Sequence, residues 1–219
     1  LIITAPSVEY HIYQTDETMI SITSPLELPD VSRIKKIEEP VVKLDIVTPK
    51  EYIGNIMKLI SEKRGEPLGS QMEYLDEERV VLHYTMPLPG IVSDFYDTLK
   101  NVSAGYASMN YEWKGFQEAD VVRLDIMVAG DVVGPLASMV YRDEAYYIGR
   151  KVVESLKEVL PKQMFEVRLQ AALGAKIIAS DRISALRKDV TAKLYGGDVT
   201  RKRKLLEKQK EGKRRMKRV

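Results

Sequence analysis

Alternating apolar and polar residues open the chain and predict a β-hairpin. Residues 7–13 and 18–23 alternate in this way, and the polar sequence Thr-Asp-Glu lies between them. Residues 24–40 largely lack the alternation and contain three prolines. Because proline has no backbone N–H and fixes its own φ angle, this stretch is interpreted as a linker.

The following stretch predicts a strand and then a helix. Residues 42–46 alternate between aliphatic and charged side chains, which is typical of a strand. Thr48 followed by Pro49 is typical of a helix start, because the Thr oxygen can cap free N–H groups and Pro suits the first turn. Apolar residues recur at helical spacing over 52–60, and Gly65 marks the helix end.

Four more elements complete a known order. Residues 71–75 and 79–86 predict strands around an acidic turn. Residues 90–101 place their apolar side chains on one helical face, and residues 107–113 alternate again. With the preceding strand and helix the order is βαββαβ, the ferredoxin-like unit of the α+β class, whose helices cover one face of an antiparallel sheet.

A third region is also α+β. Strands are predicted at 122–128 and 132–140, followed by a helix at 143–159. Residues 165–180 read as strand, and a short helix is expected at 181–192. The apolar residues on the predicted inner face of the longer helix are Ile148, Val152, Leu156 and Val159.

Composition narrows the class of protein. Of 219 residues, 44% are hydrophobic, enough for a core, which excludes wholesale disorder. No apolar run reaches the roughly 18 residues of a membrane span. The chain has no cysteine, which excludes disulfides, thiolate metal sites and a cysteine nucleophile. Its two histidines, His11 and His83, are far apart in sequence, and His83 is expected to be a packed or half-exposed strand residue.

Charge is divided unevenly along the chain. From Arg182 to the end there are fifteen Lys/Arg and four Asp/Glu, a net charge of +11. The preceding residues carry 19 Lys/Arg and 28 Asp/Glu, a net charge of −9. An acidic body with a basic tail indicates a polyanionic partner for the tail. Beyond Asp198 the sequence forms a helix that is polar all round, so it is not expected to bury a face on its own domain.

Motifs for catalysis are absent from the sequence. It contains no G-x-x-x-x-G-K-S/T phosphate loop, no H-E-x-x-H and no G-x-S-x-G. The adjacent carboxylates Glu38-Glu39, Glu77-Glu78 and Asp143-Glu144 fall in predicted loops or helix starts, where acidic residues suit turns and interact favourably with the helix dipole. These residues are therefore expected to perform no chemistry, and no metal or cofactor is expected here.

Two groups of residues are candidates for binding. Tyr106, Tyr111, Trp113 and Phe116 lie on or near one predicted strand, where rings can stack on bases. Tyr111 and Trp113 share the alternation face of Ala107, which favours a core role instead. The second candidate is the tail, where runs of Lys and Arg can neutralise phosphates. A solvated disordered end is the alternative for the tail, and its few apolar residues favour nucleic acid over lipid.

The candidate RNA-binding residues are the basic side chains of the tail, with Tyr195 as a stacking ring and two glycines that permit close backbone approach. They are Arg187, Lys188, Lys193, Tyr195, Gly196, Gly197, Arg201, Lys202, Arg203, Lys204, Lys208, Lys210, Lys213, Arg214 and Arg215.

The tail also carries a family resemblance. The sequence KLYGGDVTRKRKLLEKQKEGKRRMK at 193–217 resembles the C-terminal region of the LepA (elongation factor 4) family of ribosome-bound translational GTPases. Further stretches similar to that family are EPVVKLDIVTPKEYIGNIM (39–57), YLDEERV (74–80), SAGYAS (103–108) and LPKQMFEVRLQAALGAKIIA (160–179). Leu194 and Tyr141 depart from the family, which often has Cys and His there.

The resemblance implies a domain organisation. Residues 1–39 would end a third domain, 40–117 would be the ferredoxin-like domain shared with elongation factor G, 118–197 would be the family's own C-terminal domain and 198–219 its basic tail. The chain opens without an initiator Met and stops within a charge run, so we expect an excised piece. The GTPase domain, with its GTP and Mg²⁺, would precede Leu1.

The resemblance also implies a function. In the family the C-terminal domain reaches the peptidyl-transferase side of the ribosome and meets tRNA and 23S rRNA, in back-translocation, rescue of stalled ribosomes or initiation. The chain is thus expected to be a cytoplasmic, ribosome-associated monomer. The alternatives are a peripheral membrane module held by the tail on anionic lipid and a free-standing RNA-binding protein.

Overall fold

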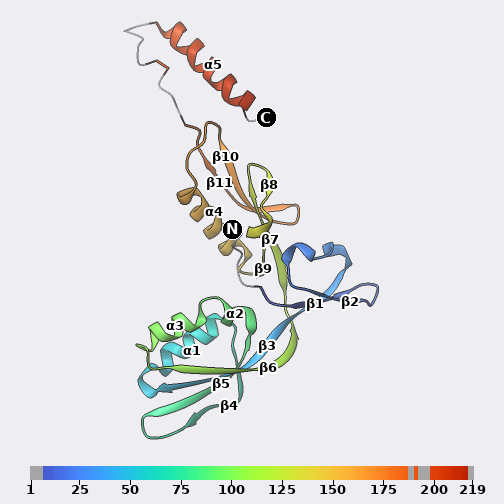
Figure 1. Cartoon of the computed structure of the whole chain (residues 1–219), viewed down its shortest axis with the longest axis vertical. Helices are drawn as coiled ribbons and strands as arrows, with labels where there is room; N and C mark the ends of the chain where they lie inside the picture. The colour runs from blue at the N-terminus through green and yellow to red at the C-terminus, as the bar shows by residue number, and fades with distance from the viewer. Residues whose placement is uncertain (1–6, 187–189, 192–197, 217–219) are drawn as a thin grey trace. The chain divides into compact units, whose positions relative to one another are not determined.

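The chain forms two compact units, Leu1–Val121 and Val122–Val219. The computed structural model describes residues 7–186, 190–191 and 198–216 of them (Figure 1). The domain limits predicted from the resemblance, at residues 39, 117 and 197, stay predictions.

The first unit contains a six-stranded antiparallel sheet and three helices. Its strands are β1 (Tyr10–Gln14), β2 (Met19–Ile22), β3 (Ile34–Pro49), β4 (Glu66–Tyr74), β5 (Arg79–Pro87) and β6 (Ser108–Glu118). Its helices are α1 (Ile53–Glu62), α2 (Leu88–Val92) and α3 (Phe95–Val102).

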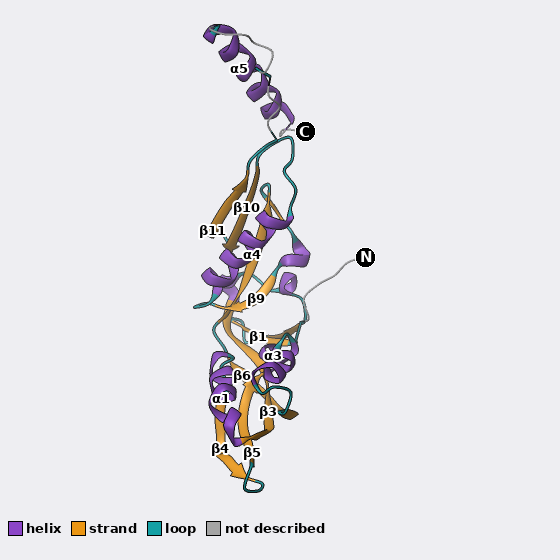
Figure 2. Cartoon of the chain, turned by 90° about the vertical axis from the view of Figure 1, so that its left-hand side faces the viewer, coloured by secondary structure: helices purple, strands orange, loops and turns teal. Residues whose placement is uncertain are grey.

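The sheet has the ferredoxin-like order. β3 lies between β5 and β6, and β4 completes the other edge beyond β5. All neighbouring strands are antiparallel, with Leu44 of β3 opposite Tyr84 of β5 on one side and Tyr111 of β6 on the other. The helices lie on one face of this sheet (Figures 1 and 2). The predicted βαββαβ fold and α+β class are confirmed, and the predicted hairpin is formed by β1 and β2 on the first half of β3.

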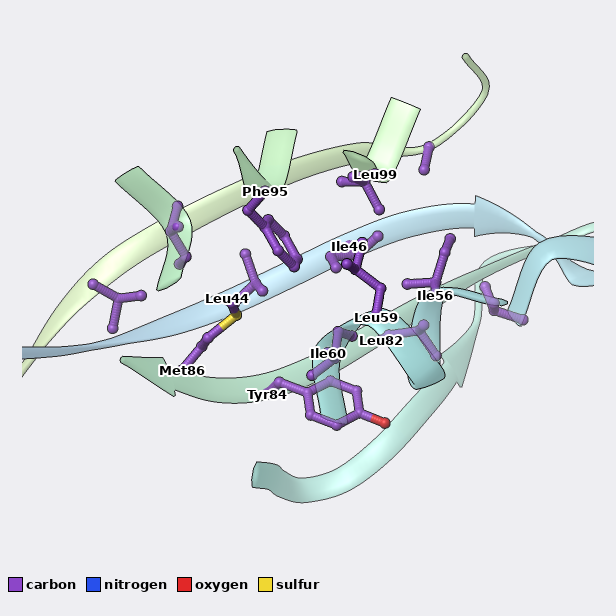
Figure 3. Packing of buried hydrophobic residues seen from close by; sticks show 14 residues of the cluster. Leu44, Ile46, Ile56, Leu59, Ile60, Leu82, Tyr84, Met86, Phe95 and Leu99 are labelled. Carbon is purple, nitrogen blue, oxygen red and sulfur yellow. The ribbon is translucent and has the colours of Figure 1, made fainter. Parts of the chain in front are cut away.

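The core of this unit lies between the sheet and its helices, as Figure 3 shows. Alternate residues of β3 and β5 face α1 and α3, because side chains of a strand alternate between the two faces. The fully buried side chains include Leu44, Ile46, Ile56, Ile60, Leu82, Met86, Phe95 and Leu99.

Three local predictions in this unit are wrong. Residues 34–40 are not linker, because β3 already begins at Ile34 and pairs there with β1. Thr48 does not cap the helix: it is buried and stays in the sheet opposite Val80, so helical turns begin only after Pro49. The segment 90–101 is two helices rather than one.

The break between α2 and α3 falls at Ser93 and Asp94. Ser93 leaves the helical region of φ and ψ, and the Asp94 carboxylate accepts a hydrogen bond from Lys63 Nζ at 2.6 Å. The same carboxylate accepts from the Ser93 hydroxyl at 3.0 Å. These hydrogen bonds, together with the Lys63–Asp94 charge pair, hold the pKa of Asp94 below its usual range. Lys63 of the segment after α1, distant in sequence, thus binds the residue at which the helix is interrupted.

The second unit contains a five-stranded sheet with one helix packed on it and a second, terminal helix. Its strands are β7 (Val121–Val128), β8 (Asp131–Val132), β9 (Ser138–Tyr141), β10 (Val167–Leu173) and β11 (Lys176–Ile183). Its helices are α4 (Ala145–Val159) and α5 (Val199–Met216). The sheet order is β11-β10-β7-β8, with β9 also paired to β7.

α4 covers β10 and β11 and encloses the second core. Ala145, Gly149 and Val153 form its buried face, so the face differs from the predicted one. Ile148, Val152 and Leu156 pack partly buried at the edge of the core, but Val159 is 79% exposed. The pattern of large apolar residues missed the true face because its closest contacts are made by small residues.

The helix expected at 181–192 is also absent in its described part. β11 continues to Ile183, which pairs with Val167 of β10, so this segment remains in the sheet. Of the strand predicted at 165–180, residues 167–173 and 176–180 are strand, and they form a hairpin that reverses at Gly174, where φ is +55°.

Candidate nucleic-acid interface

α5 carries most of the basic side chains that the sequence singles out. Asp198 caps its start, because its Oδ1 accepts a hydrogen bond from the Arg201 backbone N–H at 2.9 Å. The residues that follow are largely strong helix formers. The last turn contains Lys213, Arg214 and Arg215, whose positive charges interact favourably with the negative end of the helix dipole.

Two acidic residues within α5 are paired along the helix. Arg203 Nε lies 3.1 Å from Glu207 Oε1, and an Arg215 terminal nitrogen lies 2.6 Å from Glu211 Oε1. Both pairs are exposed and spaced i, i+4, an arrangement that contributes about 0.2–0.5 kcal/mol each to an isolated helix. Two arginines of the tail are therefore already engaged by carboxylates.

One face of α5 contacts the rest of its unit. Lys213 Nζ donates a hydrogen bond to the carbonyl oxygen of Leu186. An apolar groove of about 460 Å³ lies between this face and residues Met164, Leu186 and Val190. The half-buried residues of α5 recur at helical spacing, and they are Lys202, Leu205, Gln209, Gly212 and Lys213.

The tail was expected to form a helix that buries no face on its own domain, and α5 agrees with this prediction. Its helical phase brings Leu205, Gly212 and Met216 together on the docked side, where they line the groove. No residue of α5 is fully buried, so it is not part of a core. The basic side chains remain at the surface.

The candidate RNA-binding residues divide into two sets. Nine of them lie on α5, where seven are exposed and Lys202 and Lys213 are half-buried. The nine are Arg201, Lys202, Arg203, Lys204, Lys208, Lys210, Lys213, Arg214 and Arg215. The other six, Arg187, Lys188, Lys193, Tyr195, Gly196 and Gly197, lie outside the described residues.

The aromatic residues of β6 are not core, contrary to the favoured prediction. Tyr111 and Trp113 are 49% and 58% exposed. They do face the helix side, opposite Leu44 and Val42, but the core reaches only Met109 on this strand and Ala107 just before it. β6 is an edge strand, so the helices leave its second half uncovered.

Trp113 and Phe116 of β6 form a cluster with His11 of β1. The Phe116 ring stacks on His11 at 3.5 Å between centroids and meets the Trp113 ring edge-on at 5.2 Å. Glu9 Oε1 lies 3.6 Å from His11 Nε2, and Glu38, whose carboxylate is paired with Lys36, lies opposite His11 in the strand register. Carboxylates beside the rings disfavour a phosphate backbone there, so α5 remains the better nucleic-acid interface.

His83 is a half-exposed strand residue, as predicted. Its Nδ1 lies 2.6 Å from Asp45 Oδ1, and its Nε2 lies 3.7 Å from Glu73 Oε2. Within the described part of the chain, no cluster of three or more His, Asp or Glu could hold a metal ion. Nor does that part contain a helix long and apolar enough to cross a membrane.

Two family models together match residues 36–219. Residues 128–219 match the model described as "GTP-binding protein LepA C-terminus", and residues 36–127 match "Elongation factor G C-terminus". Elongation factor 4 from Clostridium novyi (strain NT) is 52% identical over all 219 residues. The chain belongs to the LepA family.

Other LepA-family relatives are equally similar. Elongation factor 4 from Chlorobium limicola is 51% identical and that from Clostridium botulinum (strain Hall) is 53% identical, each over the whole chain. The chain spans 36% of the length of these curated relatives. It matches the family's C-terminal portion.

Proposed function

We propose that this chain is the ribosome-binding portion of a LepA-family translation factor, and that α5 is its RNA-contacting element. The observation that carries the proposal is the helix itself. It is capped, docked along one face, and carries nine Lys/Arg against two Glu, with most of the basic side chains exposed. Such a helix offers positive charge to a phosphate backbone at little structural cost.

The proposed partners are 23S rRNA and tRNA near the peptidyl-transferase region. Contacts through phosphates carry no sequence information, so α5 would position the factor rather than read bases. The family membership supports a role in translation. The step served is proposed as back-translocation, rescue of stalled ribosomes or initiation, by a cytoplasmic and monomeric factor.

The chemistry of the whole protein is proposed to lie outside these residues. The matched model is named for a GTP-binding protein, and this sequence contains no phosphate loop. We therefore propose that GTP and Mg²⁺ bind elsewhere in the whole protein, and that this chain performs no hydrolysis. GTP turnover by the purified chain above a buffer blank would contradict this part.

Co-sedimentation with ribosomes over a salt series tests the RNA-binding part. If about six basic side chains engage phosphates, log K should fall with log[salt] at a slope of roughly −4 to −5. Vesicles of anionic lipid are run in parallel. Binding to vesicles without binding to ribosomes would support the peripheral membrane alternative and overturn the proposal.

A further inference from the structure

The nine basic residues of α5 are not equivalent, because the structure engages some of them and leaves others free. Arg203 and Arg215 pair with Glu207 and Glu211 at 3.1 and 2.6 Å. Lys213 Nζ is bonded to the Leu186 carbonyl oxygen on the docked face. The carboxylates of Glu207 and Glu211 partly neutralise Arg203 and Arg215 and repel an approaching RNA phosphate, and a phosphate on Lys213 competes with the docking contact.

A second group is free. The side chains of Arg201, Lys204 and Lys208 are exposed, and none makes an ion pair or hydrogen bond with a residue in the described ranges. Their spacing of i, i+3 and i+7 places them on one helical face, with neighbours about 5–6 Å apart. We call these three residues the free stripe.

The position of the free stripe around α5 separates it from most of the other charges, and Arg215, which shares its side of the helix, is paired with Glu211. At 100° per residue it lies between the docked face, marked by Leu205 and Gly212, and the ridge formed by Glu207 and Glu211. Lys210 and Arg214 lie beyond that acidic ridge. The stripe is thus the longest run of unpaired positive charge along one side of the helix.

We propose that the free stripe is the track on which an RNA phosphate backbone lies, and that Arg203, Lys213 and Arg215 serve mainly to form and dock the helix. The inference rests on the proposed function. Lys208 borders the docked groove that Leu205 and Met216 line. RNA is favoured over a lipid surface because the stripe itself carries no apolar residue.

Two triple variants of the 219-residue chain test this inference. Arg201→Gln/Lys204→Gln/Lys208→Gln removes the free stripe, and Arg203→Gln/Lys213→Gln/Arg215→Gln removes three engaged charges. Both change the net charge equally, and Gln is a good helix former. Binding to ribosomes and to a fluorescently labelled RNA hairpin is measured over a salt series, with helicity followed by circular dichroism.

The stripe variant should lose about 2 to 3 units of salt slope, taking 0.7–0.9 per phosphate contact. The matched variant should lose less than about 1 unit. If the two variants lose the same amount of salt slope while the helicity of the stripe variant is unchanged, the inference is overturned. The proposal that the tail binds RNA would still stand. A wild-type chain that binds neither RNA nor ribosomes, or binds only phosphatidylglycerol vesicles, would overturn the proposed function itself.

Discussion

The two long helices of the second unit form for different reasons. α4 has 15 residues and buries Ala145, Gly149 and Val153 against its sheet. α5 has 18 residues and buries none. Burial against a sheet fixes α4, whereas α5 depends on its Asp198 cap, its ion pairs and one half-buried face. A helix that contributes little to a core can devote its side chains to an external partner.

The largest difference in unfolding free energy is expected between truncation of a leucine in the core beneath α4 and truncation of a leucine on α5. Leu169 is fully buried in the cluster that includes Val153 of α4, so Leu169→Ala should cost about 2–5 kcal/mol of unfolding free energy. Leu206 of α5 is 47% exposed, and Leu206→Ala should change stability by less than about 0.5 kcal/mol. Urea unfolding measures both, and similar losses would contradict the comparison.

A methyl group added to the glycine of α4 should destabilise the second unit. A Cβ at Gly149 would lie 2.9 Å from Ala171 Cβ and 3.3 Å from Ile178 Cδ1. Overpacking outweighs the better helix propensity of alanine, so Gly149→Ala should cost about 1–2 kcal/mol. A variant as stable as wild type in thermal unfolding would show that α4 can move away from β10 freely.

A glycine-to-alanine change in α5 should instead stabilise its helix. A Cβ at Gly212 has no neighbouring atom within 4 Å, and glycine disfavours a helix by up to about 1 kcal/mol relative to alanine. Gly212→Ala should therefore raise helicity measured by circular dichroism and leave the salt slope of RNA binding unchanged. Lower helicity would mean that Gly212 is required for docking.

The smallest effect concerns the ion pair between α4 and β11. Lys157 Nζ donates to Asp181 Oδ2 at 2.8 Å, and this bond, followed by the Arg182 backbone N–H, holds the pKa of Asp181 below its usual range. A lowered pKa stabilises the fold above the ordinary carboxyl pKa, and the contribution is lost as pH falls through the folded value.

Lys157→Gln should raise the pKa of Asp181 towards its ordinary value in an NMR titration. Asp76 provides the control, because Arg79 lowers its pKa in the first unit and is untouched by the variant. An unchanged Asp181 titration would show that Arg182, through its backbone N–H and its charge, lowers the pKa without Lys157.

Much of the first unit was predictable because its strands and helices carry strong periodicity. The pattern indicated strands at residues 42–46 and 79–86, which lie in β3 and β5 respectively. Element ends were less predictable: Thr48 looks like a helix cap, but pairing with Val80 keeps it in the sheet. The segment 181–183 resembles a helix for the same reason, since local pattern does not report strand partners.

The candidate site shows the same division. Every basic residue of α5 could be named from the sequence, because charge is a property of composition. The pairs with Glu207 and Glu211 follow from i, i+4 spacing once a helix is assumed. The docked face could not be inferred, because Met164 and Leu186 are distant in sequence and only folding brings them to Leu205.

The sequence by itself determined the class of fold, the family and the charge of the tail, since periodicity, motif and composition are local properties. Tertiary structure decided which residues are buried and which are exposed. Trp113 shares the face of a buried strand but lies at an uncovered edge, and nothing in the sequence around Gly149 shows that a Cβ there would crowd Ala171 of the sheet. Burial depends on contacts between distant segments, and no local pattern encodes them.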